Sequence, residues 1–251
     1  MSPERAPRWV PVLLYHRVTP TPPPHDPYGT CVTPAGFERQ LSWLARRGYR
    51  GVTLAEIDAS LNGAAPLPPR PVAITFDDGY EDNHRHAWPI LSACGFRAAI
   101  FVVSDAIGRD SSFDAAHTAE RAPMLSAAQL RELRKGGIEI GSHSASHPDS
   151  LAALDDAALD GELSRSREAL ESLLGERVAY FAYPHSKHDP RVEAAVARAG
   201  YRLACGGEGS RFSSACVNRV EAGSASGISL EAHARVQQLK WRVRLAQGRR
   251  G

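Results

Sequence analysis

Short apolar runs that alternate with amphipathic segments are the feature that most constrains the fold of this chain. Residues 72–76 form a continuous run of this kind, typical of a strand buried on both faces in a parallel sheet. Comparable runs predict further strands at 10–18, 49–53, 98–103, 138–140, 178–182 and 201–204.

The segments between these runs predict helices. Thr33 and Pro34 suit the N-cap and first position of a helix, and the apolar positions that follow share one face. Further helices are predicted at 54–61, 83–94, 126–135, 155–174, 190–199 and 229–245. Strands that alternate with helices indicate βα units around a parallel sheet, and this many units predicts an α/β fold of the barrel type.

Composition narrows the class of protein further. A length of 251 residues suits a single domain (1–251), with 228–251 as a C-terminal helix and basic tail. The net charge of +2 gives no reason to expect a nucleic-acid partner, and the four cysteines form no C-x-x-C pair. No apolar run reaches the length of a membrane span, and no signal-peptide pattern is seen, so we expect a cytoplasmic protein. The oligomeric state is not indicated.

Polar residues cluster where the predicted strands end. Asp77 and Asp78 follow strand 72–76, and two adjacent carboxylates repel each other unless a cation compensates. A simple Asp-Gly turn is the alternative at this point. His143 and His147 follow strand 138–140 and are spaced to converge on one ion. Two imidazoles and one carboxylate leave coordination positions open, as in a catalytic site. Such ligands suit Zn²⁺ best, with Co²⁺, Ni²⁺, Mn²⁺ or Fe²⁺ as alternatives.

Two further positions are candidates. Tyr183, Pro184 and His185 follow strand 178–182, where a Tyr-Pro turn with an aromatic packed beneath it is the alternative. His16 ends the first predicted strand, where a hydrogen bond to a loop is the alternative role.

The clusters, taken in this order, resemble the polysaccharide deacetylase family, the NodB-type family also called carbohydrate esterase family 4. The family pattern Thr-Phe-Asp-Asp-Gly is met at 75–79, and His-Ser/Thr-x-x-His at 143–147. The resemblance implies an irregular, incomplete (β/α) barrel of about seven strands. It also implies Asp77 as catalytic base, and Asp78, His143 and His147 as metal ligands.

Many members carry a late Leu-x-His motif whose histidine is the general acid. Here that pattern occurs at the front, as Leu14-Tyr15-His16, which resembles the circularly permuted branch that includes poly-N-acetylglucosamine deacetylases. The resemblance therefore implies that His16 is the acid, which would hand a proton to the departing amine. The backbone N–H of His185 is predicted to donate to the oxyanion.

The third motif departs from the family pattern. Classical members carry an arginine shortly before the proline, which pairs with the catalytic aspartate, whereas Phe181 and Ala182 stand there in this chain. His185 and Ser186 stand where an aromatic residue and glycine are usual. The departure leaves open how Asp77 is tuned.

The resemblance implies a metal-dependent hydrolase of linear amides, which removes N-acetyl groups from an N-acetylated amino sugar in a polysaccharide or glycoconjugate. A deacetylase or deformylase of a small-molecule or lipid-linked amide is the second interpretation. A non-catalytic carbohydrate-binding domain is the third.

Overall fold

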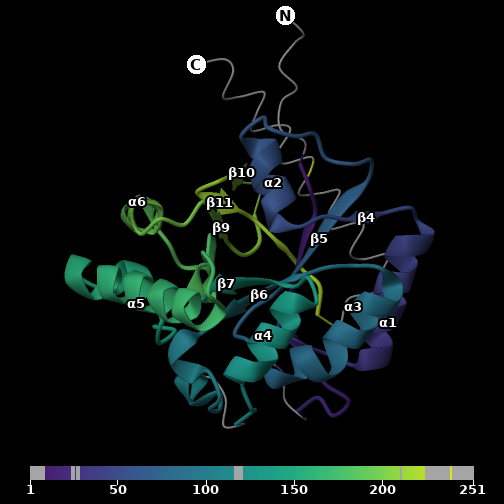
Figure 1. Cartoon of the computed structure of the whole chain (residues 1–251), viewed down its shortest axis with the longest axis horizontal. Coiled ribbons are helices and arrows are strands. Elements are labelled where there is room, and N and C mark those ends of the chain that lie inside the picture. Colours follow the sequence, from purple (N-terminus) through teal and green to yellow (C-terminus); the bar gives the residue numbers. More distant parts are fainter. Residues whose placement is uncertain are drawn as a thin grey trace, which may run out of the picture.

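A mostly parallel sheet forms the centre of the molecule (Figure 1). The computed structural model describes residues 9–23, 26, 29–115, 121–209, 211–223 and 238. Seven strands form a continuous parallel series, in the order β12-β1-β5-β6-β7-β8-β9. Their bounds are β1 (Val12–Tyr15), β5 (Pro71–Phe76), β6 (Ala99–Val102), β7 (Glu139–Ser142), β8 (Tyr180–Ala182), β9 (Leu203–Cys205) and β12 (Val220–Glu221). The predicted α/β fold with about seven main strands is confirmed.

Short strands extend this series. β4 (Arg50–Gly51) pairs with β5, while β11 (Cys216–Val217) and β10 (Phe212–Ser213) follow β9 at one end. A separate pair consists of β2 (Arg17–Val18) and β3 (Cys31–Val32). Within the described ranges the two terminal strands, β10 and β12, do not pair with each other, so the sheet stays open, as expected for an incomplete barrel.

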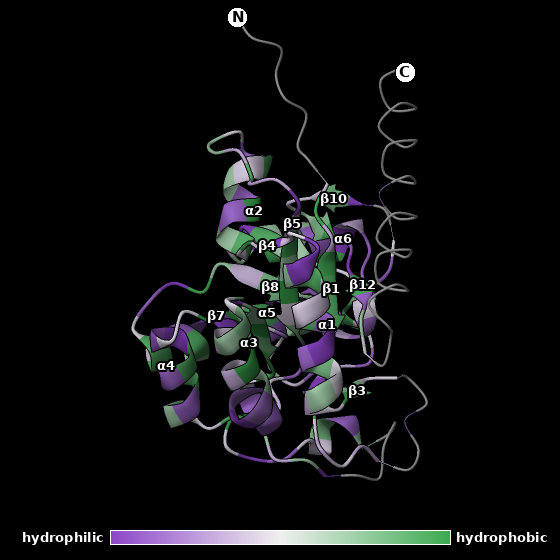
Figure 2. Ribbon diagram, turned by 90° about the vertical axis from the view of Figure 1, so that its right-hand side faces the viewer, coloured by the Kyte–Doolittle hydropathy of each residue, from purple (hydrophilic) through white to green (hydrophobic). Residues whose placement is uncertain are grey.

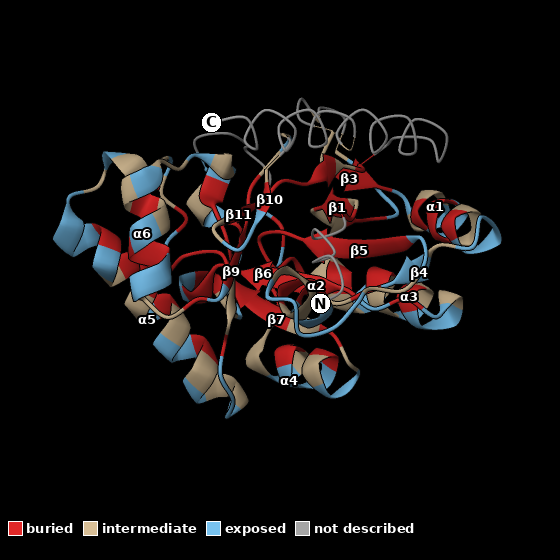
Figure 3. Cartoon of the chain, turned by 90° about the horizontal axis from the view of Figure 1, so that it is seen from above, coloured by how far each residue is buried: buried red, intermediate tan, exposed pale blue. Residues whose placement is uncertain are grey.

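Helices cover the outside of the sheet. They are α1 (Pro34–Arg46), α2 (Leu54–Leu61), α3 (Trp88–Cys94), α4 (Ala127–Lys135), α5 (Asp156–Leu174) and α6 (Pro190–Arg198). Their apolar faces turn inward and their charged faces outward, as the hydropathy and burial colouring show (Figures 2 and 3). Local sequence sets where they begin: the Thr33 hydroxyl accepts a hydrogen bond from the Gly36 amide, as predicted for the start of α1.

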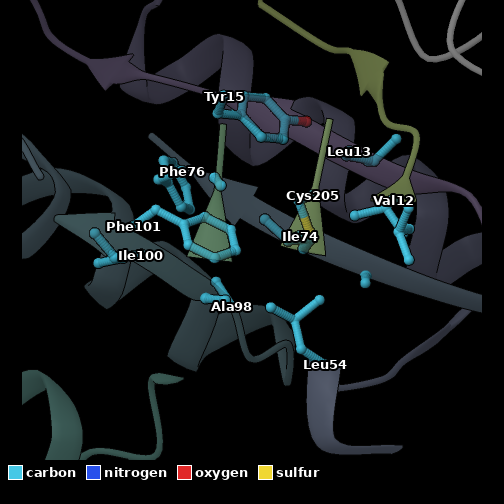
Figure 4. Close-up of a cluster of buried hydrophobic side chains, with 14 of the residues drawn as sticks. Val12, Leu13, Tyr15, Leu54, Ile74, Phe76, Ala98, Ile100, Phe101 and Cys205 are labelled. Atoms are coloured by element: carbon cyan, nitrogen blue, oxygen red, sulfur yellow. The ribbon is translucent and has the colours of Figure 1, made fainter. Parts of the chain in front are cut away.

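The core lies between the central strands (Figure 4). Every residue of β5 is buried, because this strand has neighbours on both edges and side chains packed on both faces. The Tyr15 and Phe76 rings stack with centroids 5.5 Å apart across the β1–β5 register. This packing fixes the carboxyl ends of β1 and β5 side by side.

Three details differ from the sequence predictions. The predicted strand 10–18 breaks at His16, because residues 17–18 leave β1 to pair with β3. The predicted helix 83–94 begins as a π-helical turn, Asn83–Ala87. The strands β3, β10, β11 and β12 were not predicted. The predicted helix 229–245 and the tail 228–251 lie outside the described residues, apart from Gln238.

None of the helices in the described part of the chain is long and apolar enough to cross a membrane.

Candidate active site

The turn after β5 presents two carboxylates at the carboxyl end of the sheet. Asp77 continues β5 and donates its backbone N–H to the Tyr15 carbonyl at 3.0 Å. Asp78 and Gly79 then adopt left-handed conformations, with φ of 72° and 84°. A side chain at Gly79 would strain this turn and press on Val102, whose methyl carbons would lie 3.3 Å from an added Cβ. The Asp-Gly pair therefore forms a strained turn that presents a functional carboxylate, rather than a turn that only reverses the chain.

The loop after β7 holds the two histidines. His143 follows β7 directly, and its Nδ1 lies 2.9 Å from the Ala182 carbonyl. Since a carbonyl only accepts, Nδ1 carries the proton and Nε2 keeps its lone pair free for a ligand bond. Ser144 and His147 are left-handed, with φ of 66° and 59°, a conformation that costs roughly 1–2 kcal/mol for each non-glycine residue. Contacts with the rest of the fold, rather than the conformational preferences of its own residues, therefore hold this loop in place.

Three side chains converge at this edge of the sheet. Asp78 Oδ1 lies 3.5 Å from His143 Nε2 and 3.5 Å from His147 Nε2, and the three ligand atoms all lie within 4.8 Å of one another. Two ligands of a tetrahedral ion with bonds of about 2.0–2.1 Å are separated by about 3.4 Å. Both the spacing and the chemistry of the donors therefore fit a divalent ion with an open coordination position.

The electrostatics of the three side chains also fit a bound cation. Burial raises the pKa of Asp78 well above its usual value, and the neighbouring Asp77 adds to the effect. Burial lowers the pKa values of His143 and His147, which keeps both imidazoles neutral. Neutral imidazoles are the form that binds a metal, and a bound dication reverses the penalty on Asp78.

Asp77 has a countercharge supplied by the chain itself. Arg219 forms a bidentate pair with it, from Nη1 to Oδ1 at 2.7 Å and from Nη2 to Oδ2 at 2.6 Å. The Arg219 side chain is fully buried, and its Nε donates to the Gly206 carbonyl at 2.8 Å. Burial alone would raise the pKa of Asp77, but the Arg219 guanidinium outweighs burial and holds the pKa below its usual value.

Arg219 is the functional residue that the sequence interpretation missed. The arginine absent before Pro184 is replaced by one between β11 and β12, and its guanidinium reaches the same carboxylate. The available signal was a charged residue close to Val217 and Val220, in a segment too short and irregular to be predicted as strand.

His16 lies at the same edge of the sheet. The register that pairs Tyr15 with Phe76 brings His16 beside Asp77. Its Nδ1 lies 3.9 Å from Glu221 Oε1, and neither atom has a hydrogen-bond partner within the described ranges. Burial lowers the pKa of His16 to about 4, against an opposing effect of Asp77, and burial raises the pKa of Glu221 to about 7. The imidazole is therefore neutral at pH 7, whereas Glu221 keeps part of its proton.

His185 borders the metal ligands. It lies in the turn Pro184–Ser186 with φ of 51°, and its ring centroid is 4.6 Å from that of His147. Phe113 approaches the ring of His147 as well, at 5.0 Å. The structure thus brings the histidine side chain, and not only its backbone, next to the triangle. The role of its N–H remains a prediction.

The chain resembles known proteins in both sequence and fold. The model of the polysaccharide deacetylase family matches residues 64–204. The chain is 27% identical over 197 residues to the YxkH protein of Bacillus subtilis, covering 78% of this chain and 64% of that protein. It is 25% identical over 179 residues to the poly-beta-1,6-N-acetyl-D-glucosamine N-deacetylase of Staphylococcus aureus, covering 68% of this chain and 59% of that enzyme. The chain therefore spans less than two thirds of the length of either relative.

A solved structure shares the fold. IcaB from Ammonifex degensii superposes with a TM-score of 0.74 and 26% identity, covering 92% of this chain and 97% of that one.

Proposed function

Because the chain belongs to the polysaccharide deacetylase family, we propose that it is a metal-dependent hydrolase that removes N-acetyl groups from an N-acetylated amino sugar of a polysaccharide or glycoconjugate. One observation carries the proposal. Asp78, His143 and His147 converge on one point, while the adjacent Asp77 is paired with Arg219 and stays outside the ligand set. A ligand triangle of this kind can hold an ion that activates water, and an unligated carboxylate beside it can act as general base.

Asp78, His143 and His147 would hold a divalent ion, with Zn²⁺ suited best by one oxygen and two nitrogen donors. When bound, the ion would supply Lewis-acid polarisation of the amide carbonyl and would lower the pKa of water.

Asp77 would accept the proton of the attacking water. Arg219 orients both carboxylate oxygens and keeps the group ionised, which makes the base always available but weak. Such a weak base would suffice, because a bound ion would make the water more acidic.

His16 would deliver a proton to the departing amine, so that the C–N bond breaks without releasing an amide anion. Its imidazole is neutral in the resting site, so the proton has to arrive before that step. Glu221, 3.9 Å away and with a pKa of about 7, is a suitable donor. Negative charge on the tetrahedral oxyanion would favour the imidazolium at that moment.

The backbone N–H of His185 would donate to the same oxyanion. A well-aimed donor of this kind lowers the barrier by roughly 3–4 kcal/mol. A substitution tests the role of this N–H only indirectly, because it leaves the His185 N–H in place while changing the ring that packs on His147.

The choice of an N-acetylglucosamine substrate is supported by the name of the S. aureus relative and remains a proposal for this chain. The test is acetate release by the Zn²⁺-loaded protein from β-1,6-linked N-acetylglucosamine oligomers, from chitooligosaccharides and from a monomeric N-acetyl sugar. Release from an oligomer with bound metal supports the proposal. Acetate release from the monomer only favours the second interpretation, as does release of formate from a formylated amide, or of acetate from a lipid-linked amide, in a parallel assay. Saccharide binding without turnover on any of these substrates favours the third.

A further inference from the structure

The loop that carries His143 and His147 needs support from outside itself. Its two left-handed residues, Ser144 and His147, flank Ala145 and Ser146. The Ser144 hydroxyl accepts the His147 amide at 3.0 Å, which is the main hydrogen bond that the loop makes within itself. The backbone N–H groups of Ala145 and Ser146 point out of the loop and require another acceptor.

Glu162 on α5 provides that acceptor. Its Oε2 lies 3.0 Å from the Ala145 amide and 2.8 Å from the Ser146 amide, and its Oε1 accepts from the Ser146 hydroxyl at 2.9 Å. Only 8% of the residue is exposed. A buried carboxylate that receives three hydrogen bonds from consecutive residues fixes their backbone in one conformation.

A second contact from the same helix face supports the start of the loop. Ser166 lies one turn after Glu162, and its Oγ is 2.7 Å from the Oγ of Ser142, the last residue of β7. The Ser142 Oγ also accepts from the Ser144 amide at 3.3 Å. Helix α5 therefore contacts the segment on both sides of His143.

We propose that Glu162 is a positioning residue for the metal site, holding the His143–His147 loop so that the two imidazoles face Asp78 before the ion binds. This inference rests on the proposed metal-dependent function. A site formed in advance binds its ion without first ordering the loop, and loss of an outer-shell partner typically lowers metal affinity 10- to 100-fold.

The experiment measures the dissociation constant for Zn²⁺ by competition with a chromogenic chelator. We expect Glu162→Ala to raise that constant at least about tenfold. Glu162→Gln keeps one carbonyl acceptor for the amides and loses the charge, so we expect an intermediate increase. Because Gln also preserves the volume, it decides the question if the alanine variant does not fold.

Glu139 offers a matched control. It is the first residue of β7, at the opposite end of the strand, and its carboxylate accepts from the Leu54 and Ala55 amides at 2.7 and 3.0 Å. Glu139→Ala therefore also removes backbone hydrogen bonds to a carboxylate, but far from the ligands. We expect it to lower the thermal midpoint of the metal-free protein while changing the Zn²⁺ constant by less than about twofold.

The outcomes separate the two proposals. If the wild-type protein binds no Zn²⁺ or other divalent ion, the proposed function fails and the role of Glu162 fails with it. If the wild type binds Zn²⁺ and the folded Glu162 variants bind it equally well, only the role of Glu162 is overturned. It is likewise overturned if Glu139→Ala weakens binding as much as Glu162→Ala does.

Discussion

Asp77 and Asp78 are neighbours in the chain, yet the molecule treats the two carboxylates in opposite ways. On the Asp77 side, a fully buried arginine supplies the countercharge, and the pKa of Asp77 falls. On the Asp78 side, the nearest partners are two neutral imidazoles, and the pKa of Asp78 rises. Asp77 therefore has its countercharge within the fold, whereas Asp78 is arranged for a positive charge that none of the described residues supplies.

The largest expected effect is on turnover and metal content, which should distinguish Asp77 from the metal ligands. Asp77→Asn should reduce kcat by at least about 10³-fold, since the general base is lost, and should leave the amount of bound metal unchanged. His143→Ala should lose both metal and turnover. Acetate release and elemental analysis of the same samples check this. Normal turnover by Asp77→Asn, or loss of its metal, would show that the two carboxylates do not have separate roles.

The second largest effect is expected on folding stability when Arg219, the countercharge of Asp77, is replaced. Arg219→Met leaves the buried Asp77 without its cation, and breaking a buried pair in this way costs about 3–5 kcal/mol of folding stability. Adding Asp77→Asn removes the unpaired charge, so we expect the double variant to recover part of the loss. Urea unfolding of the metal-free proteins measures both values. A double variant as unstable as the single one would mean that Arg219 acts through packing, for example on Phe101.

A smaller effect is expected from the pH dependence of stability. Burial lowers the pKa of His16 to about 4 in the folded state from 6.5. Between these values the unfolded chain binds more protons, so stability rises with pH there and is lost on acidification. We expect His16 to account for about 2 kcal/mol of the stability lost between pH 7 and pH 5.

His16→Gln should flatten that part of the curve, as judged from urea unfolding of the metal-free protein at the two pH values. An unchanged slope would mean that folding does not shift the pKa of His16, and a steeper slope in the variant would mean that His16 is protonated in the resting site and needs no donor.

The smallest effect tests the Asp78 side directly. Without metal, Asp78→Asn relieves repulsion from Asp77 and the burial of an uncompensated charge, so we expect it to stabilise the metal-free protein by about 1 kcal/mol, or about 2–4 °C. The same variant should no longer be stabilised by Zn²⁺. Thermal unfolding with and without the ion measures both, and a lower midpoint without metal would contradict the comparison.

The sequence predicted one side of this comparison much better than the other. Asp78, His143 and His147 occur in short contiguous patterns at the ends of long apolar strands, so both the strands and the ligands were evident. Glu221 lies in the two-residue strand β12, and Arg219 lies between β12 and the two-residue strand β11, where the pattern is too brief to indicate a strand or its direction. Their contacts with Asp77 and His16 depend on β12 pairing with β1, a register across some 200 positions that no local signal specifies.

The local sequence also failed to predict the backbone conformation where it is strained. Nothing in the residue types of Ser144, His147 or His185 predicts a positive φ, because each is held there by tertiary contacts. The support from Glu162 was hidden for the same reason, since a glutamate in an amphipathic helix is ordinarily solvated.

The position of β1 has a consequence for how the protein is made. This strand lies between β5 and β12, whose residues are synthesised about 60 and 200 positions later. One edge of β1 therefore stays unpaired for most of translation, because β1 cannot acquire its second neighbour until synthesis has passed residue 221. His16 and Arg219, the earliest and nearly the latest of the groups around Asp77, meet only at that moment. An incomplete translation product would contain His16 but lack both the countercharge Arg219 and the proton donor Glu221, so partial chains should be catalytically silent even when most of the sheet has formed.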